Sequence, residues 1–265
     1  MSSTKQVEVK EDVVYGHGGG RELKCDVFTP EGVSAPAPAI LIVHGGAWVV
    51  GDKTQLKGYG FLLGREGYVC IACEYRLAGE SQWPAQIHDV KAAIRWIRAN
   101  AAELNIDPER IAICGASSGA QLALIAAGTP NKAELEGEGG NPGESSAVAA
   151  AVSFYAPTTL SPGGDMLRDS VDKLLGKDAD ASIYADASPS SYLSAEFPPT
   201  MLMHSHQDEL IPPEHSISFA AGLHALNVPV ELYVFDNAPH MFDGEKRLGR
   251  QAASMIQSFL ERYLN

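Results

Sequence analysis

A serine lies in a glycine-flanked pentapeptide that could supply a nucleophile. Gly115-Ala116-Ser117-Ser118-Gly119 follows a short apolar run and precedes a run of small, helix-forming residues. The G-x-S-x-G pattern between a strand and a helix is typical of a sharp turn that lifts the serine hydroxyl above the sheet. The flanking glycines leave room for that turn, and Ser117 is expected to have a strained backbone. The alternative, a serine that only caps the helix, fits Ser118 better than Ser117.

A second glycine-containing segment could bind negative charge. His44-Gly45-Gly46-Ala47-Trp48 follows another apolar run. Acyl transfer passes through a tetrahedral oxyanion, and each backbone N–H group aimed at it contributes roughly 3 kcal/mol. We expect the N–H groups of Gly46, Ala47 and Ser118 to form this oxyanion hole, with Gly45 as the substitute for one of them.

Large side chains near these segments are candidates for contact with a substrate. We expect Trp48, Trp83 and Met241 to line the pocket, although Trp48 fits equally well packed beneath its loop. His44 ends a strand, and a structural role is expected for it instead of catalysis.

The base should follow the nucleophile in the chain, because triads on this kind of sheet run in the order serine, acid, histidine. His240 comes just after the apolar run Val230 to Phe235, at the strand end where catalytic groups collect. His215 and His224 fall in a predicted helix. His204 and His206 form an H-x-H pair without a third ligand cluster, so we predict no metal site.

The acid is expected at Asp208, which follows the strand Thr200 to Met203 and precedes a proline-started helix. A carboxylate there could orient His240 and stabilise its imidazolium form. Glu209 is the alternative, and Asp243 lies too close to His240 in the sequence.

The elements that would position these groups alternate along the chain. Strands are expected at Val7 to Lys10, Leu23 to Phe28, Ala39 to Val43, Tyr68 to Cys73, Arg110 to Cys114, Val148 to Phe154, Thr200 to Met203 and Val230 to Phe235. Helical periodicity marks His88 to Leu104, Ser118 to Ala127, Glu214 to Ala225 and Glu245 to Tyr263. This alternation predicts an α/β fold in which a mostly parallel sheet has helices on both faces, with an antiparallel hairpin first.

Two stretches interrupt the alternation. Thr129 to Ser146 is rich in glycine and glutamate, and we expect an exposed loop there. Ser161 to Leu193 could form a small lid within residues 158–195 or an ordinary long connection. Residues 1–265 are expected to form one domain, since α/β domains of this length commonly stay single.

Composition excludes several classes of protein. The formal net charge of −13 argues against a nucleic-acid partner, which needs clustered Lys and Arg. There is no apolar stretch long enough to span a membrane and no secretory leader after Met1, so a cytoplasmic protein is expected. Cys70 and Cys73 form a C-x-x-C, but three residues apart on a strand they face opposite ways. We therefore expect buried thiols, not a redox pair.

Together these motifs resemble the hormone-sensitive-lipase-like and feruloyl-esterase-like branch of the α/β-hydrolases. The residues that carry the resemblance are His44-Gly45-Gly46-Ala47-Trp48, Glu74-Tyr75-Arg76-Leu77, Trp83-Pro84-Ala85, Asp89, the Ser117 turn, Asp208 and His240. The resemblance covers the chain from about residue 22 onward. It implies carboxylesterase activity on a small-molecule ester without a cofactor, and it implies that Arg76 and Asp89 are structural.

The chain departs from that pattern in three ways. Almost nothing precedes its first strands where lipase-like members carry a cap, so we expect a small or absent cap, an open site and short acyl groups. Ser205 stands where glycine is frequent before the acid loop, and Ser118 and Ala120 stand where Ala and Gly are usual.

Other functions use the same apparatus. Arylformamidases and lactonases share the triad, and non-catalytic hormone receptors share the fold but usually lack the histidine that is present here as His240. A monomer or a homodimer is expected.

Overall fold

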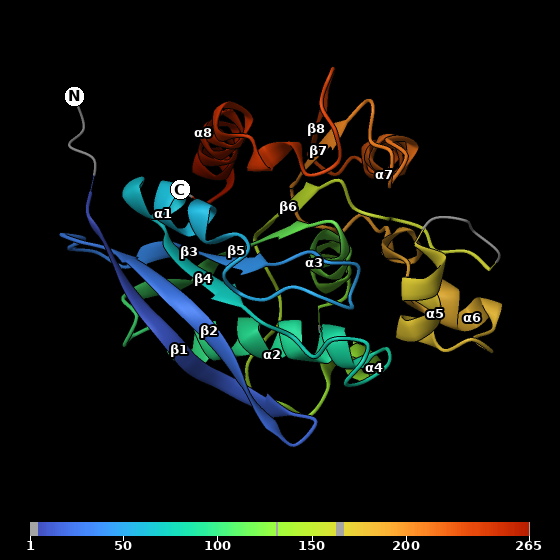
Figure 1. The fold of residues 1–265 in the computed structure, drawn as a ribbon. Helices are drawn as coiled ribbons and strands as arrows, with labels where there is room; N and C mark the ends of the chain where they lie inside the picture. The colour runs from blue at the N-terminus through green and yellow to red at the C-terminus, as the bar shows by residue number, and fades with distance from the viewer. Residues whose placement is uncertain (1–4, 131, 163–166, 265) are drawn as a thin grey trace.

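A single eight-stranded sheet organises the chain. The computed structural model describes residues 5–130, 132–162 and 167–264. The strands are β1 (Val7–Gly18), β2 (Arg21–Pro30), β3 (Ala37–Val43), β4 (Val69–Cys73), β5 (Ile106–Ala116), β6 (Ala150–Phe154), β7 (Thr200–Ser205) and β8 (Val230–Phe235). Their order across the sheet is β1-β2-β4-β3-β5-β6-β7-β8 (Figure 1).

The sheet is mostly parallel. Every neighbouring pair from β4 to β8 runs parallel, whereas β1 pairs with β2 and β2 pairs with β4 in antiparallel fashion. The predicted α/β class and the N-terminal hairpin are therefore confirmed. Parallel strands end at one edge of the sheet, so the loops after β3, β5, β7 and β8 meet there.

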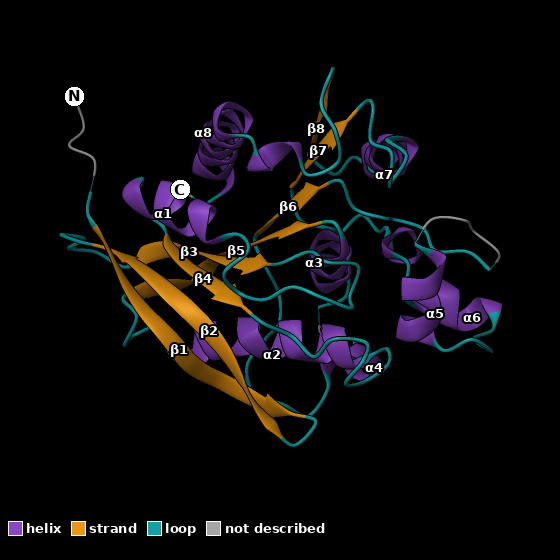
Figure 2. Cartoon of the chain, viewed as in Figure 1, coloured by secondary structure: helices purple, strands orange, loops and turns teal. Residues whose placement is uncertain are grey.

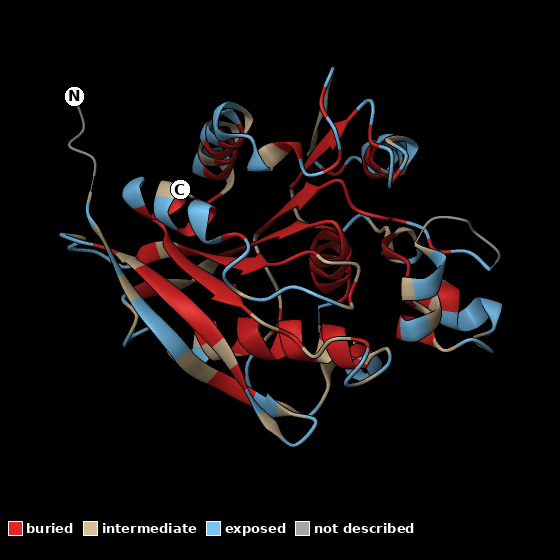
Figure 3. Ribbon diagram, viewed as in Figure 1, coloured by how far each residue is buried: buried red, intermediate tan, exposed pale blue. Residues whose placement is uncertain are grey.

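Helices cover both faces (Figure 2). The principal ones are α1 (Lys57–Arg65), α2 (Ala85–Ala99), α3 (Ser118–Gly128), α7 (Glu214–Ala225) and α8 (Lys246–Tyr263). Side chains of α1 and α8 pack in one apolar cluster, and those of α2, α3 and α7 pack in the other. Helix α3 is buried on every side, whereas α7 and α8 present polar faces outward (Figure 3).

Element boundaries differ from the predicted ones around α2 and β5. Helix α2 begins at Ala85, directly after Pro84, and it ends at Ala99 instead of Leu104. Strand β5 begins at Ile106, which pairs with Ala37, four residues before the predicted start at Arg110.

The glycine-rich stretch 129–146 is less exposed than predicted, because it supplies a carboxylate to α2. It contains the short helix α4 (Ala133–Glu136). Glu136 accepts hydrogen bonds from Lys91 at 2.8 Å and Arg95 at 2.6 Å, whose side chains are almost fully buried. Two buried cations need such a partner, so this part of the stretch folds against the domain.

The stretch 158–195 contains the helices α5 (Arg168–Leu175), α6 (Ala181–Asp186) and the 3-10 turn η1 (Pro189–Tyr192). Residues 163–166, in the stretch that could form either a lid or an ordinary connection, and residues 1–4, on which the leader prediction rests, lie outside the described residues. In the part of the chain that the structure describes, no helix is both long and apolar enough to cross a membrane.

The cysteines are structural thiols in this fold. Cys70 and Cys73 lie on β4 and contribute to opposite apolar clusters, which confirms their predicted orientation. All four cysteines are free and buried. Burial raises the pKa of the Cys73 thiol well above its ordinary value, so it has little thiolate to react.

Replacing Gly119 by alanine is expected to destabilise the fold. A Cβ at this position would overlap the carbonyl oxygens of Val43 and His44, because the start of α3 packs directly against the end of β3. We expect the free energy of unfolding, measured in urea, to fall by about 1–3 kcal/mol. Gly58→Ala in α1 is the control, because its Cβ would meet nothing within 4 Å. It should instead stabilise by about 0.5–1 kcal/mol, and equal stability of the two variants would contradict the close packing of α3.

Candidate active site

The turn that carries Ser117 has the strained geometry that its sequence predicted. Ser117 has φ +52° and ψ −120° and stands between the end of β5 and the start of α3. Its N–H donates to Phe154 O at 2.9 Å, which ties the turn to β6. A Cβ at Gly115 would overlap Gly119 O, so this strand-to-helix turn depends on glycine on both sides of the serine.

His240 and Asp208 lie against each other, as predicted. His240 Nδ1 and Asp208 Oδ2 are 2.6 Å apart. The backbone N–H groups of Leu210 and Ile211 donate to Asp208 Oδ1 at 2.9 and 2.8 Å. A carboxylate held in this way fixes the orientation of the imidazole and leaves Nε2 free to exchange a proton.

A second imidazole, which the sequence did not reveal as part of the site, also reaches Asp208. His204 Nε2 lies 3.3 Å from Asp208 Oδ2 and donates to Ile211 O at 2.9 Å, while its Nδ1 faces Ser216 Oγ at 2.7 Å. Both ring nitrogens therefore have protein partners. The spacing of four residues between His204 and Asp208 was the available signal.

The charge of Asp208 depends on these donors. Burial by itself would raise the pKa of Asp208, but the hydrogen bonds from His204, His240 and Ile211 outweigh it and hold the pKa well below its ordinary value. Because the side chain has no exposed surface, these donors and not bulk water stabilise its ionised form.

The two other acids considered for this role have different partners. Glu209 Oε2 accepts from the backbone N–H of His240 at 3.3 Å, not from its ring. Asp243 Oδ1 accepts from Tyr155 Oη at 2.5 Å, and burial raises the pKa of Asp243.

Ser205 joins the two loops that carry the acid and the base. The hydroxyl of Ser205 donates to the carbonyl oxygen of Ala238, which lies two residues before His240. Ser205 itself lies three residues before Asp208. A glycine, frequent at this position in the resembling sequences, has no hydroxyl to make this bond.

The segment after β3 turns back on itself beside Ser117. Gly46 and Ala47 have φ of +114° and +50°, and Gly46 O accepts from the N–H groups of Val49 and Val50. Among the described residues, the N–H groups of Gly46 and Ala47 donate to no other group. Ser118 is the first residue of α3, so its N–H has no acceptor within that helix.

His44 lies beneath this segment in a buried position. Its ring stacks on Tyr75 with centroids 4.3 Å apart, and its Nδ1 contacts Gly45 O at 2.7 Å. Burial lowers the pKa of His44, which keeps the ring neutral. These contacts fit the predicted structural role.

Ser117 and His240 open onto one cavity of about 620 Å³. Its other lining residues come mainly from the loops after β3 and β8 and from α1 and α8: Gly45, Gly46, Ala47, Val49, Val50, Gln55, Leu56, Gly58, Tyr59, Leu62, Ala116, Tyr155, Leu167, Leu210, Met241, Asp243, Gly244, Lys246, Gly249 and Arg250. Ser117 and His240 are both among the described residues, and no hydrogen bond joins their side chains in this structure. Such bonds often tighten only when a substrate binds.

Of the side chains predicted to line the pocket, Met241 does so and two do not. Trp48 is fully buried, because φ of +61° turns it inward, and its Nε1 donates to Gln121 Oε1 at 3.0 Å. Gln121 Nε2 in turn donates to Ala187 O at 2.6 Å, beside α6. Trp83 is also outside the lining and donates to Asp186 Oδ2 at 2.8 Å. Assigning these two tryptophans to the pocket was wrong.

Comparison with known families now bears on this geometry. Residues 25–223 match the family described as BD-FAE, a span that includes the segment after β3, Ser117 and Asp208. The chain belongs to the BD-FAE family. This places it in the esterase branch of the α/β-hydrolases, as its motifs predicted.

Individual proteins to which the chain is similar are esterases by name. A probable carboxylic ester hydrolase, LipM of Mycobacterium tuberculosis, is 32% identical over 95% of this chain and 61% of its own length. The chain thus spans about three fifths of that relative. Among solved structures, a thermophilic esterase of Thermogutta terrifontis with propionate bound has a TM-score of 0.82, 26% identity and coverage of 98% and 94% of the two chains. A truncated carbohydrate esterase from gut microbiota shares the fold at a TM-score of 0.85 and 23% identity, over 98% and 99% of the chains.

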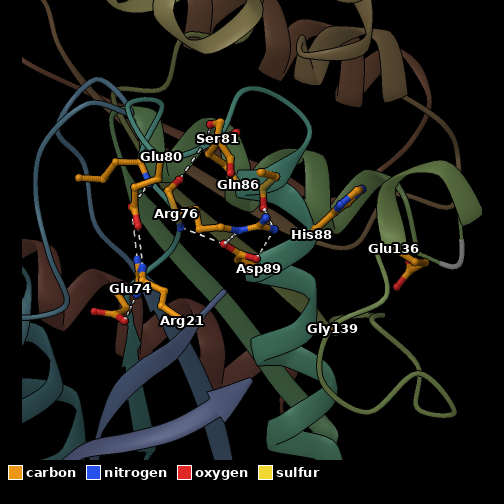
Figure 4. Close-up of polar contacts among 12 residues, drawn as sticks. Arg21, Glu74, Arg76, Glu80, Ser81, Gln86, His88, Asp89, Glu136 and Gly139 are labelled. Atoms are coloured by element: carbon orange, nitrogen blue, oxygen red, sulfur yellow. Dashed lines mark hydrogen bonds and ion pairs between the residues drawn. The ribbon is translucent and has the colours of Figure 1, made fainter. Parts of the chain in front are cut away.

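In this BD-FAE chain, Arg76 and Asp89 form an ion pair away from the cavity (Figure 4). Arg76 Nη2 and Nε donate to the two oxygens of Asp89 at 2.7 and 2.8 Å, and the Arg76 N–H donates to Oδ2 at 2.9 Å. Asp89 lies on α2, so the pair fastens the loop after β4 to that helix, which agrees with the structural role implied by the resemblance.

Proposed function

We propose that this protein is a serine carboxylesterase that hydrolyses short-chain or small aryl or carbohydrate esters through an acyl-enzyme. The observation that carries the proposal is the shared cavity: Ser117, on its strained turn, opens onto it together with His240, whose ring is held by Asp208. A nucleophile, a base and an orienting acid at one cavity form the arrangement that activates a serine.

Each residue has a defined part in this proposed reaction. His240 Nε2 removes the Ser117 proton as Oγ attacks the ester carbonyl carbon, and the carbonyl oxygen becomes an oxyanion. The N–H groups of Gly46, Ala47 and Ser118 would donate to that oxyanion. His240 then gives the proton to the departing alcohol, and a water deprotonated by the same imidazole releases the acid from Ser117.

The preference for a short acyl group has one supporting comparison. The Thermogutta terrifontis esterase, which covers nearly all of this chain in structure, is described with propionate bound. Arylformamidase and lactonase activities are the alternatives, because they require the same three side chains. A receptor without activity would have no use for an intact triad.

The test is a series of p-nitrophenyl esters with acyl chains of two to twelve carbons, assayed beside N-formylkynurenine. We expect kcat/KM to be highest for the two- to four-carbon esters and much lower for the formamide. Rapid turnover of the formamide with no turnover of the short esters would overturn the esterase proposal in favour of an arylformamidase.

A further inference from the structure

Two positive side chains border the cavity without a carboxylate to neutralise them. Lys246 and Arg250 line the same cavity as Ser117, and both are exposed. Within the described residues, neither makes a salt bridge, whereas their neighbour Arg247 faces Glu245 at 4.0 Å. Other Lys and Arg side chains of this chain also make no salt bridge among the described residues, so what sets Lys246 and Arg250 apart is their position at the cavity.

The geometry of α8 directs both cations to the cavity. Positions four apart lie on one face of a helix, so Lys246 and Arg250 stand one above the other. Gly249 lies on that face too, and a Cβ there would overlap Asp243 O, so the helix backbone packs directly against the turn after His240. This contact holds the first two turns of α8 at the edge of the cavity.

The remainder of the lining offers little opposing charge. Apolar side chains form much of the wall near the mouth, including the exposed Val50, Leu210 and Met241. Asp243 is the acid in the lining, and its carboxyl group is engaged by Tyr155, whose hydroxyl donates to Oδ1. The cavity therefore combines an apolar wall with a positive edge.

We infer that the substrate is an ester with an anionic group, such as a carboxylate, at the far end of its apolar part, and that Lys246 and Arg250 bind this group. The inference rests on the proposed function, because it concerns the substrate of the same site. An apolar chain or ring would lie along the wall while the charged end remains at the partly hydrated mouth, where a cation gains from pairing without full desolvation.

The test uses pairs of esters that differ in the charged end. On the acyl side, mono-p-nitrophenyl adipate is compared with p-nitrophenyl hexanoate. On the alcohol side, 4-acetoxybenzoate is compared with 4-methylphenyl acetate. For at least one pair, we expect kcat/KM at low salt to be about tenfold higher for the anionic ester, the size of two partly exposed charge pairs. The ratio should fall in 0.5 M NaCl because salt screens such pairs.

The double variant Lys246→Gln, Arg250→Gln tests the residues themselves. Glutamine is a polar, unbranched residue with a helix propensity close to that of lysine and arginine, so α8 should persist. We expect the anionic-to-neutral ratio to fall toward one in this variant. Arg247→Gln is the control, because it removes one positive charge from the same helix at a position outside the cavity, and it should keep the wild-type ratio.

The outcomes separate this inference from the proposed function. Hydrolysis of neutral esters with no anionic preference in either pair would overturn the inference and leave the esterase proposal intact. A preference that survives the double variant would overturn the assignment to Lys246 and Arg250. If the protein hydrolysed none of the four esters, both proposals would be overturned.

Discussion

Ser117→Ala is expected to lower kcat for a short p-nitrophenyl ester by about 10⁴- to 10⁶-fold. Alanine retains the backbone turn but has no hydroxyl to form the acyl-enzyme, so only binding and the oxyanion donors would remain to assist water. The positive φ at this position should not be strained further, because alanine has the same Cβ as the serine that it replaces. Steady-state kinetics and far-ultraviolet circular dichroism measure the loss of turnover and the retention of fold.

Covalent labelling adds a direct readout for this variant. A fluorophosphonate should attach once to the wild-type chain, at Ser117 by peptide mass, and not to Ser117→Ala. Ser153→Ala is the control, since Ser153 pairs with Gly115 across the sheet and its hydroxyl is buried with no hydrogen-bond partner among the described residues. A Ser117→Ala enzyme with activity within tenfold of the wild type would contradict the proposed mechanism.

Asp208→Asn is expected to lower kcat by about 10⁴-fold with a much smaller change in KM. Asparagine has nearly the same shape, but its amide can favour the His240 tautomer in which Nε2 holds the proton, and that tautomer cannot act as the base. The loss should persist across the acid limb of the pH profile, because the pKa of Asp208 lies far below its ordinary value and the wild-type carboxylate stays ionised there.

Asp243→Asn is the matched control for Asp208→Asn. Both acids are close to His240 in space, but Asp243 is bonded to Tyr155 and not to the imidazole. We expect Asp243→Asn to change kcat by less than about tenfold. If Asp243→Asn, and not Asp208→Asn, abolished turnover, the acid would have to be reassigned.

Much of the fold and of the proposed triad could be predicted from the sequence, because both depend on order along the chain. Short apolar runs bounded by turn residues located the parallel strands, and β8 has the predicted bounds Val230–Phe235. Parallel strands bring their carboxyl ends together. The loops that hold Ser117, Asp208 and His240 therefore had to meet at one edge.

The features that could not be predicted depend on local backbone angles and on contacts between distant segments. Trp48 is buried because two successive residues, Ala47 and Trp48, adopt positive φ, which nothing in their types requires. Glu136 is held in place by buried cations on α2, although β5 and α3 lie between them in the chain. His204 has an ordinary position on β7, and only the folded loop brings Asp208 back to its ring.

The amide of Gln121 has a consequence for motion. Its Oε1 accepts a hydrogen bond from Trp48, at the end of the segment His44 to Trp48, and its Nε2 donates to Ala187 O beside α6. All of these atoms are buried. Moving either partner away from α3 would leave a buried polar group unpaired, at about 1–3 kcal/mol. The segment His44 to Trp48, α3 and the turn after α6 are therefore expected to move together. The proposed oxyanion donors, Gly46 and Ala47, would then stay aimed between turnovers and would not need to be reassembled for each substrate.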